Sequence, residues 1–228
     1  MSSMVELQYF GHSFFKIKDK KDVILIDPIF ETTKTKFNKN EKIPSKMSDM
    51  KGTSLILITN ETEEHFDKIA VQKIAMENNS TVVAHDFILN DLNLPRTKKI
   101  PIGSNFEVNI KGLKIETKTA HYPNSFCPTG FLININGTKI YHAGVTSLLD
   151  SFSGIKPDIA ILPMSSQTMD VVDLVRAAKI MKPKTLIPMQ YDIFETKKFD
   201  SKDLDKRIKE SILQTQTILL KPGKKIKL

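Results

Sequence analysis

The sequence has few of the residues on which several classes of protein depend. Its 228 residues include one cysteine, Cys127, whereas a disulfide or a thiolate-rich metal site needs at least two. Arginine is scarce among the 34 basic residues, with only Arg96, Arg176 and Arg207. Lysine supplies most of the net charge of +8, and its hydrated point charge is less suited to reading bases than the arginine fork. We therefore do not expect nucleic acid as the partner.

Long apolar runs and linkers are also missing. No stretch approaches the ~20 apolar residues of a membrane span, and the start of the chain lacks the basic and apolar regions of a secretory signal. No segment is rich in Pro, Gly or Ser as a linker would be, so we expect one domain over residues 1–228. The hydrophobic fraction of 40% is enough for a sizeable core. The sequence predicts a cytoplasmic protein without membrane contact.

Strand and helix patterns alternate along most of the chain. The expected strands cover residues 5–10, 14–18, 22–27, 54–58, 80–84, 106–110, 113–119, 130–135, 139–142, 159–162, 185–188 and 217–220. The expected helices cover residues 63–77, 170–181 and 201–214, and residues 31–51 lack a period and are expected to form a surface loop. Each half has a strand meander and a strand–helix alternation, which predicts two sheets packed face to face with helices outside.

One junction between strand and helix concentrates polar side chains. An apolar strand ends at Thr59, and Asn60-Glu-Thr-Glu-Glu-His65 follows before the next expected helix. Loops at the carboxyl ends of strands are where side chains converge on a ligand in α/β folds. We therefore take this loop as the centre of the candidate site.

Several short motifs together resemble those of the metallo-β-lactamase superfamily, in its branch of small metal-dependent hydrolases similar to ascorbate-phosphate lactonases. They are Tyr9-Phe-Gly-His-Ser13, Ile24-Leu-Ile-Asp-Pro28, Leu57-Ile-Thr59 with Glu64-His65, Ala120-His121, Tyr141-His-Ala-Gly-Val-Thr146, Ile161-Leu-Pro163 and Ile187-Pro-Met-Gln-Tyr191. Their order runs from about residue 5 to 220. The resemblance implies an α/β fold, an αββα sandwich of two mixed β-sheets with helices on the outer faces.

The resemblance also implies a pair of zinc or manganese ions that generate a hydroxide for hydrolysis. It places the family's seven ligand positions at Asn60, Thr62, Glu64, His65, His121, Val145 and Gln190. In the family these positions are His, His, Asp, His, His, a bridging Asp and His, so five of the seven depart here. The resemblance places His12, Asp27 and His142 beside the cleft as hydrogen-bonding residues outside the ligand set.

The five replaced ligand positions do not argue equally strongly against metal binding. Val145 has no donor atom, so it cannot bridge two metals. Asn60, Thr62 and Gln190 offer neutral oxygens that suit a hard cation and are poor ligands for zinc. Only Glu64, His65 and His121 remain as plausible donors. We expect no cofactor, and the alternative is a single Zn or Mn ion on these three side chains.

Structural explanations compete with ligation for most of these residues. Asn60 and Thr62 are favoured N-cap types, and Glu63 and Glu64 would then lie in the first helical turn, where the helix dipole favours negative charge. His65 and His121 are either hydrogen-bonded remnants of the cleft or ligands. Asp27 is expected to bind loop backbone. Cys127 is expected to be a bystander thiol unless its pKa is lowered.

Three functions follow from these patterns. The first is a catalytically silent member of the hydrolase fold that binds a small molecule or a protein partner. The second is a single-metal hydrolase of an ester, lactone or phosphoester that uses Glu64, His65 and His121, so whether the chain is an enzyme stays open. The third, motivated by charge, is a nucleic-acid binder. An oligomer is compatible with all three.

Overall fold

A computed structural model describes residues 4–30, 45–191, 201–211 and 213–228, except that the side chains of residues 201 and 202 are not described. The chain forms two compact units, which are described one at a time. The first unit contains Met1–Gly103, Ser125–Cys127 and Lys221–Leu228, and the second contains Ser104–Asn124 and Pro128–Leu220. The prediction of one domain over residues 1–228 stays a prediction.

The first unit is built on a mixed sheet of seven strands in the order β14-β1-β2-β3-β4-β5-β6. Its elements are β1 (Glu6–Gly11), β2 (Phe14–Lys18), β3 (Val23–Ile26), η1 (Met47–Met50), β4 (Leu55–Leu57), α1 (Lys68–Glu77), β5 (Thr81–His85), α2 (Asp86–Asp91), η2 (Arg96–Lys98), β6 (Lys99–Ile102) and β14 (Lys225–Lys227). The strands from β14 to β3 pair antiparallel, and those from β3 to β6 pair parallel. Parallel pairing places the carboxyl ends of β3 and β4 side by side.

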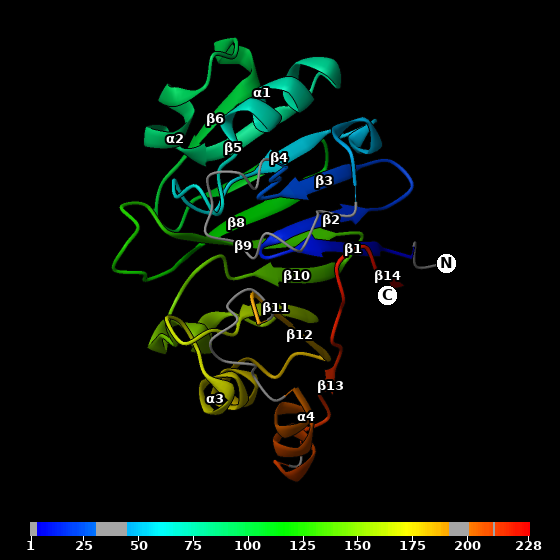
Figure 1. Cartoon of the computed structure of the whole chain (residues 1–228), viewed down its shortest axis with the longest axis vertical. Helices are drawn as coiled ribbons and strands as arrows, with labels where there is room; N and C mark the ends of the chain where they lie inside the picture. The colour runs from blue at the N-terminus through cyan, green and yellow to red at the C-terminus, as the bar shows by residue number, and fades with distance from the viewer. Residues whose placement is uncertain (1–3, 31–44, 192–200, 212) are drawn as a thin grey trace. The chain divides into compact units, whose positions relative to one another are not determined.

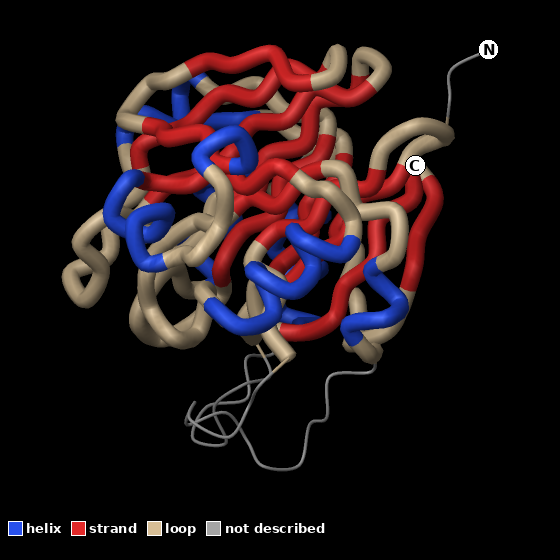
Figure 2. Tube along the Cα trace, turned by 90° about the horizontal axis from the view of Figure 1, so that it is seen from above, coloured by secondary structure: helices blue, strands red, loops and turns tan. Residues whose placement is uncertain are grey.

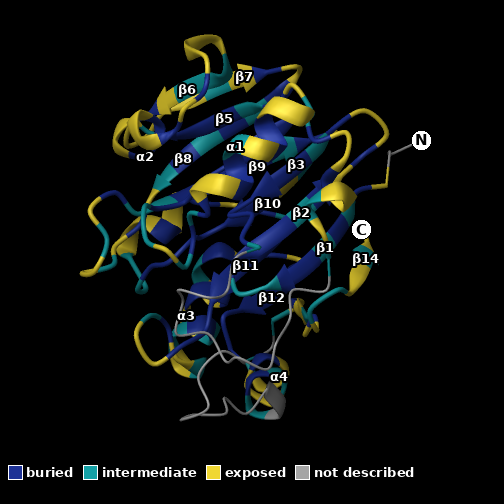
Figure 3. Cartoon of the chain, turned by 45° about the horizontal axis from the view of Figure 1, so that its top comes forward, coloured by how far each residue is buried: buried dark blue, intermediate teal, exposed yellow. Residues whose placement is uncertain are grey.

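Two helices cover one face of this sheet (Figures 1 and 2). The apolar side of α1, with Val71 and Ile74, packs on strand residues such as Ile56 and Val82 in one buried cluster. The opposite side of α1 carries Ile69 and other exposed residues, which Figure 3 shows in yellow. The helix forms because its apolar residues recur every three or four positions, and burying that stripe stabilises it.

The second unit repeats this plan with a mixed sheet in the order β13-β12-β11-β10-β9-β8-β7. Its elements are β7 (Glu107–Ile110), β8 (Leu113–Thr119), β9 (Thr129–Ile135), β10 (Thr138–His142), η3 (Asp150–Gly154), β11 (Ile159–Pro163), α3 (Val171–Met181), β12 (Thr185–Met189), α4 (Ser201–Glu210) and β13 (Gln216–Thr217). Leu174 of α3 and Leu204 of α4 share a buried cluster with Leu162 and Leu186 of the sheet. The predicted fold class is confirmed, because the described residues form two mixed seven-stranded sheets and four α-helices.

The structure corrects several expectations about elements. Helix α1 begins at Lys68, not at residue 63, and α4 ends at Glu210, not at residue 214. Strands β6 and β14 were not expected from the sequence. The expected loop at 31–51 lies mostly outside the described residues, and its last part contains η1. No helix in the described part of the chain is long and apolar enough to cross a membrane.

Candidate functional site

The end of strand β3 holds a buried carboxylate, Asp27, in the first unit. One carboxylate oxygen of Asp27 accepts the Thr59 backbone N–H at 2.8 Å, and the other accepts the Thr59 hydroxyl at 2.6 Å. Asp27 has a φ of 48°, in the left-handed region that short polar residues tolerate best. Because β3 and β4 run parallel, this backbone turn directs the Asp27 side chain across to the end of β4. The expected contact between Asp27 and loop backbone is present.

His65 completes this buried cluster. Its Nδ1 lies 2.6 Å from an oxygen of Asp27 and 3.0 Å from the Thr59 hydroxyl, and its side chain is 1% exposed. A carboxylate on Nδ1 fixes the orientation of the ring, an arrangement that commonly supports histidines whose Nε2 binds a metal. The His12 ring packs edge-on against His65 with centroids 4.8 Å apart, and His12 Nδ1 lies 3.0 Å from the Ser13 hydroxyl.

The loop between Thr59 and His65 closes on itself. The buried side chain of Asn60 accepts both the Thr62 backbone N–H at 3.0 Å and the Thr62 hydroxyl at 2.6 Å, which forms an Asx turn. The carbonyl of Thr62 then accepts the backbone N–H groups of His65 and Phe66. Asn60 and Thr62 therefore stabilise a turn, and the prediction that they cap helix α1 is wrong. Glu64 is half-buried in this loop.

The cap of helix α1 is Asp67. Its side chain accepts the Ala70 backbone N–H at 2.9 Å, and its second oxygen accepts the Phe30 backbone N–H at 2.9 Å. The side-chain oxygen of Asn60 already accepts two hydrogen bonds from Thr62. The helix therefore starts after Asp67, whose carboxylate can reach the free N–H groups of the first turn.

Sequence reasoning missed a clasp between Glu61 and the segment Ser125–Cys127, which belongs to the same unit. The Glu61 carboxylate accepts hydrogen bonds from the Ser125 hydroxyl at 2.9 Å and from the Phe126 backbone N–H at 2.5 Å. It also accepts the Cys127 backbone N–H at 3.3 Å and the Cys127 thiol at 3.1 Å. The contact spans about sixty residues of sequence, and no local pattern signals it.

The clasp shifts two pKa values in opposite directions. Partial burial would raise the pKa of Glu61, but the hydrogen bonds from the backbone, from the Cys127 thiol and from Ser125 outweigh it and hold the pKa at about 2. Burial, followed by the hydrogen bond to Glu61 and its negative charge, raises the pKa of Cys127 to about 12. A thiol with so high a pKa is a poor nucleophile, which agrees with the expected bystander role.

The second unit carries the remaining predicted residues. His121, after β8, is exposed, and its backbone N–H donates to the Thr146 hydroxyl at 2.9 Å. His142 is fully buried, and its Nδ1 accepts the Gly144 backbone N–H at 3.2 Å. Val145 is 5% exposed and presents only carbon atoms at its side chain. Gln190 is buried after β12 with a φ of 66°.

Within each unit, therefore, some of the predicted residues meet. In the first unit, Asp27 and His65 bond to each other and His12 packs on His65, while Asn60 and Thr62 pair beside them. In the second unit, His121 bonds to the segment that contains Val145. Among the described residues, no three His, Cys, Asp or Glu side chains form a group that could hold a metal ion.

Known proteins resemble the chain along its whole length. Residues 6–190 match the model of the β-lactamase superfamily domain. A "UPF0173 metal-dependent hydrolase" of Korarchaeum cryptofilum is 30% identical, with 99% of this chain and 100% of the relative aligned. The protein of the same name from Staphylothermus marinus is 32% identical, with 96% and 97% aligned.

A solved structure matches the fold closely. The metallo hydrolase Igni18 of Ignicoccus hospitalis superposes with a TM-score of 0.81 over 99% of both chains at 24% sequence identity. At that identity the likeness concerns the fold, which is that of the metallo-β-lactamases.

Proposed function

The chain belongs to the β-lactamase superfamily, and from this premise we propose that it uses the superfamily scaffold to bind a small molecule or a protein partner, without two-metal hydrolysis. Its relatives carry the name of metal-dependent hydrolases. The proposal concerns how this chain differs from the metal site that the family resemblance implies.

Val145 is the observation that carries the proposal. The resemblance assigns to this position the carboxylate that bridges two metal ions. An isopropyl group has no lone pair, so it can neither bind a cation nor balance the charge of two of them. The side chain is buried at 5% exposure, as an apolar packing residue would be. The residues present do not fit a two-metal centre.

The loop residues support the same proposal. The oxygen of Asn60 already accepts two hydrogen bonds from Thr62, so metal binding there would break the turn that both residues form. Neutral amide and hydroxyl oxygens are in any case poor zinc ligands. The hydrogen bonds between Asn60 and Thr62 fix the conformation of the loop and position its polar groups at the end of β4.

Metal content and activity test the proposal together. The protein is purified with zinc and manganese present, desalted and measured by elemental analysis, and then assayed on ester, lactone and phosphodiester substrates. We expect far less than one metal ion per chain and no metal-dependent hydrolysis. The Staphylothermus marinus relative, purified in parallel, controls for metal lost during handling. One tightly held ion per chain, with hydrolysis lost in His121→Ala, would refute the proposal.

A second candidate is a single-metal hydrolase that uses Glu64, His65 and His121 with one Zn or Mn ion. The favouring observation is the 2.6 Å contact between Asp27 and His65 Nδ1, because it orients the ring as metal-binding histidines are oriented. Zinc titration by calorimetry separates the two candidates. One-to-one binding that disappears in both His65→Gln and Glu64→Gln, and persists in Glu63→Gln, would favour the single-metal hydrolase.

A further inference from the structure

A lysine array lies on the first unit's sheet, on strands that carry none of the seven ligand positions implied by the resemblance. In the pairing of β14, β1 and β2, Gln8 lies between Lys225 and Lys16, and Glu6 lies between Lys227 and Lys18. The six residues form two rows across three strands. We call the four lysines, Lys16, Lys18, Lys225 and Lys227, the lysine array.

All six side chains project from one face of the sheet. Residues directly opposite each other in antiparallel strands share a face, as do residues two apart along a strand. The intervening residues Leu7 and Ile17 are fully buried, whereas Lys18, Lys225 and Lys227 are exposed. The Cα atoms of neighbouring lysines are therefore about 6.7 Å apart along a strand, and about 9.6 Å apart where one strand lies between them.

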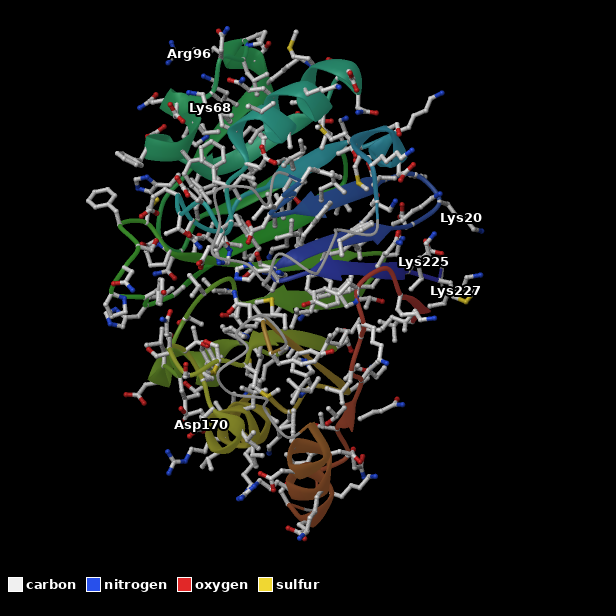
Figure 4. The ribbon with its side chains drawn as sticks, viewed as in Figure 1. Lys20, Lys68, Arg96, Asp170, Lys225 and Lys227 are labelled. Carbon is white, nitrogen blue, oxygen red and sulfur yellow. The ribbon has the colours of Figure 1, made fainter. Side chains whose placement is uncertain are left out.

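Few acidic groups offset this charge. Glu6, the one carboxylate among the six residues, lies 3.2 Å from Lys225, so four lysines and one glutamate leave a net charge of +3. Partial burial lowers the pKa of Lys16, and the positive charge of Lys225 lowers it further; Glu6 and Asp49 oppose this shift, and Lys18 adds to it. Lys20, on the turn after β2, lies on the same side of the unit as Lys225 and Lys227 in Figure 4.

Protection of a sheet edge explains only part of the array. Lysines on an edge strand discourage pairing with other chains, which accounts for Lys225 and Lys227 on β14. Lys16 and Lys18 lie on β2, which has β1 and β3 as neighbours, so no edge there needs protection. The residues directly opposite these lysines on β1 are Gln8 and Glu6, not other lysines, so four like charges share one face with a single carboxylate among them.

We propose that the lysine array binds the phosphate backbone of a nucleic acid without reading its sequence. Lysine binds phosphate as a point charge, and phosphate contacts position a nucleic acid but carry no sequence information. The scarcity of arginine argued against base reading, and backbone binding does not require it. An anionic membrane fits less well, because the residues between the lysines are Gln8 and Glu6 and neither offers an apolar anchor.

Fluorescence anisotropy with a labelled 20-nucleotide single strand and the matching duplex, between 50 and 200 mM salt, tests the proposal. With four phosphate contacts, wild-type affinity for the single strand should fall about 50-fold over this range. In the variant K18Q/K225Q/K227Q, affinity for the single strand should fall only about threefold over the same salt range. The control K73Q/K139Q/K179Q removes the same charge from exposed lysines on α1, β10 and α3, and it should behave as wild type.

Several outcomes would overturn the proposal. The proposal is overturned if the wild-type protein binds neither oligonucleotide at 50 mM salt. It is also overturned if the control variant loses as much affinity as the K18Q/K225Q/K227Q variant, because binding would then respond to net charge alone. Binding to phosphatidylserine vesicles without binding to oligonucleotides would assign the array to a membrane surface. Circular dichroism melting verifies folding, and if the triple variant unfolds, Lys18→Gln alone should reduce the salt slope by about 0.7.

Discussion

At the scale of single residues, Asp27 determines the candidate site of the first unit. Its carboxylate accepts a hydrogen bond from the Thr59 backbone N–H and lies 2.6 Å from His65 Nδ1. All three residues are buried. We expect Asp27→Asn to lower the free energy of unfolding by about 3 kcal/mol, because the buried groups of Thr59 and His65 lose their charged acceptor. Asparagine itself tolerates the left-handed backbone at this position. Urea denaturation measures the change. Asp91→Asn removes an exposed partner of Lys68 and should cost less than about 1 kcal/mol; equal costs would contradict the role of burial.

Glu61 makes stability depend on pH in a defined window. Its pKa of about 2 in the folded chain lies below its ordinary value of 4.5, so its contribution is complete above about pH 5 and is lost as the pH falls toward 2. Because solvent screens this partly exposed group, we expect about 1 kcal/mol. The difference in unfolding free energy between wild type and Glu61→Gln should be constant from pH 7 to 5 and should shrink toward pH 3. A difference that grows on acidification would contradict the clasp.

Two buried tyrosines offer a matched comparison in the second unit. The Tyr141 hydroxyl is buried with no hydrogen-bond partner among the described residues, whereas the Tyr191 hydroxyl donates to the Leu220 carbonyl at 2.8 Å. We expect Tyr141→Phe to stabilise the protein by about 1 kcal/mol and Tyr191→Phe to destabilise it by a similar amount. Thermal melting of the two variants measures both signs. Destabilisation by Tyr141→Phe would indicate a partner for that hydroxyl.

At the scale of elements, the start of α1 tests the corrected boundary. Asp67 caps the helix and also binds the Phe30 N–H, so Asp67→Ala should cost about 1–2 kcal/mol. Glu63→Ala is the control, because Glu63 is exposed and five residues before the helix begins, and it should cost less than about 0.5 kcal/mol. Chemical denaturation of both variants decides between the two boundaries. A large cost only in Glu63→Ala would restore the boundary expected from sequence.

Hydrophobic patterns in the sequence predicted most elements, and the failures have identifiable causes. The strands β2 and β8 have the predicted bounds, because their alternating or apolar residues reflect burial directly. Strand β6 contains Pro101 at the sheet edge, and β14 is the short segment Lys-Ile-Lys, which is a strand only through pairing with β1. Such partners are distant in sequence and leave no local signal.

At the scale of the whole molecule, the resemblance predicted the fold, whereas the contacts within the candidate site required the structure. Asp27, His65 and Thr59 could be named because each follows or lies near a strand end. The clasp of Glu61 on Ser125–Cys127 joins loops far apart in sequence, so periodicity and motif spacing carry no information about it. The lysine array is likewise a product of strand pairing across the two ends of the chain.

Metal should leave the stability of the whole chain unchanged if the proposed function is right. A ligand present at a thousand times its dissociation constant stabilises a protein by about 4 kcal/mol, which for a chain of this size raises Tm by about 8–16 °C. Without a two-metal site, zinc, manganese or EDTA should each shift Tm by less than about 1 °C. Differential scanning calorimetry makes the measurement, with the Staphylothermus marinus relative as the comparison. A rise of several degrees with zinc, abolished by His65→Gln, would mean that the remaining donors still form a metal site.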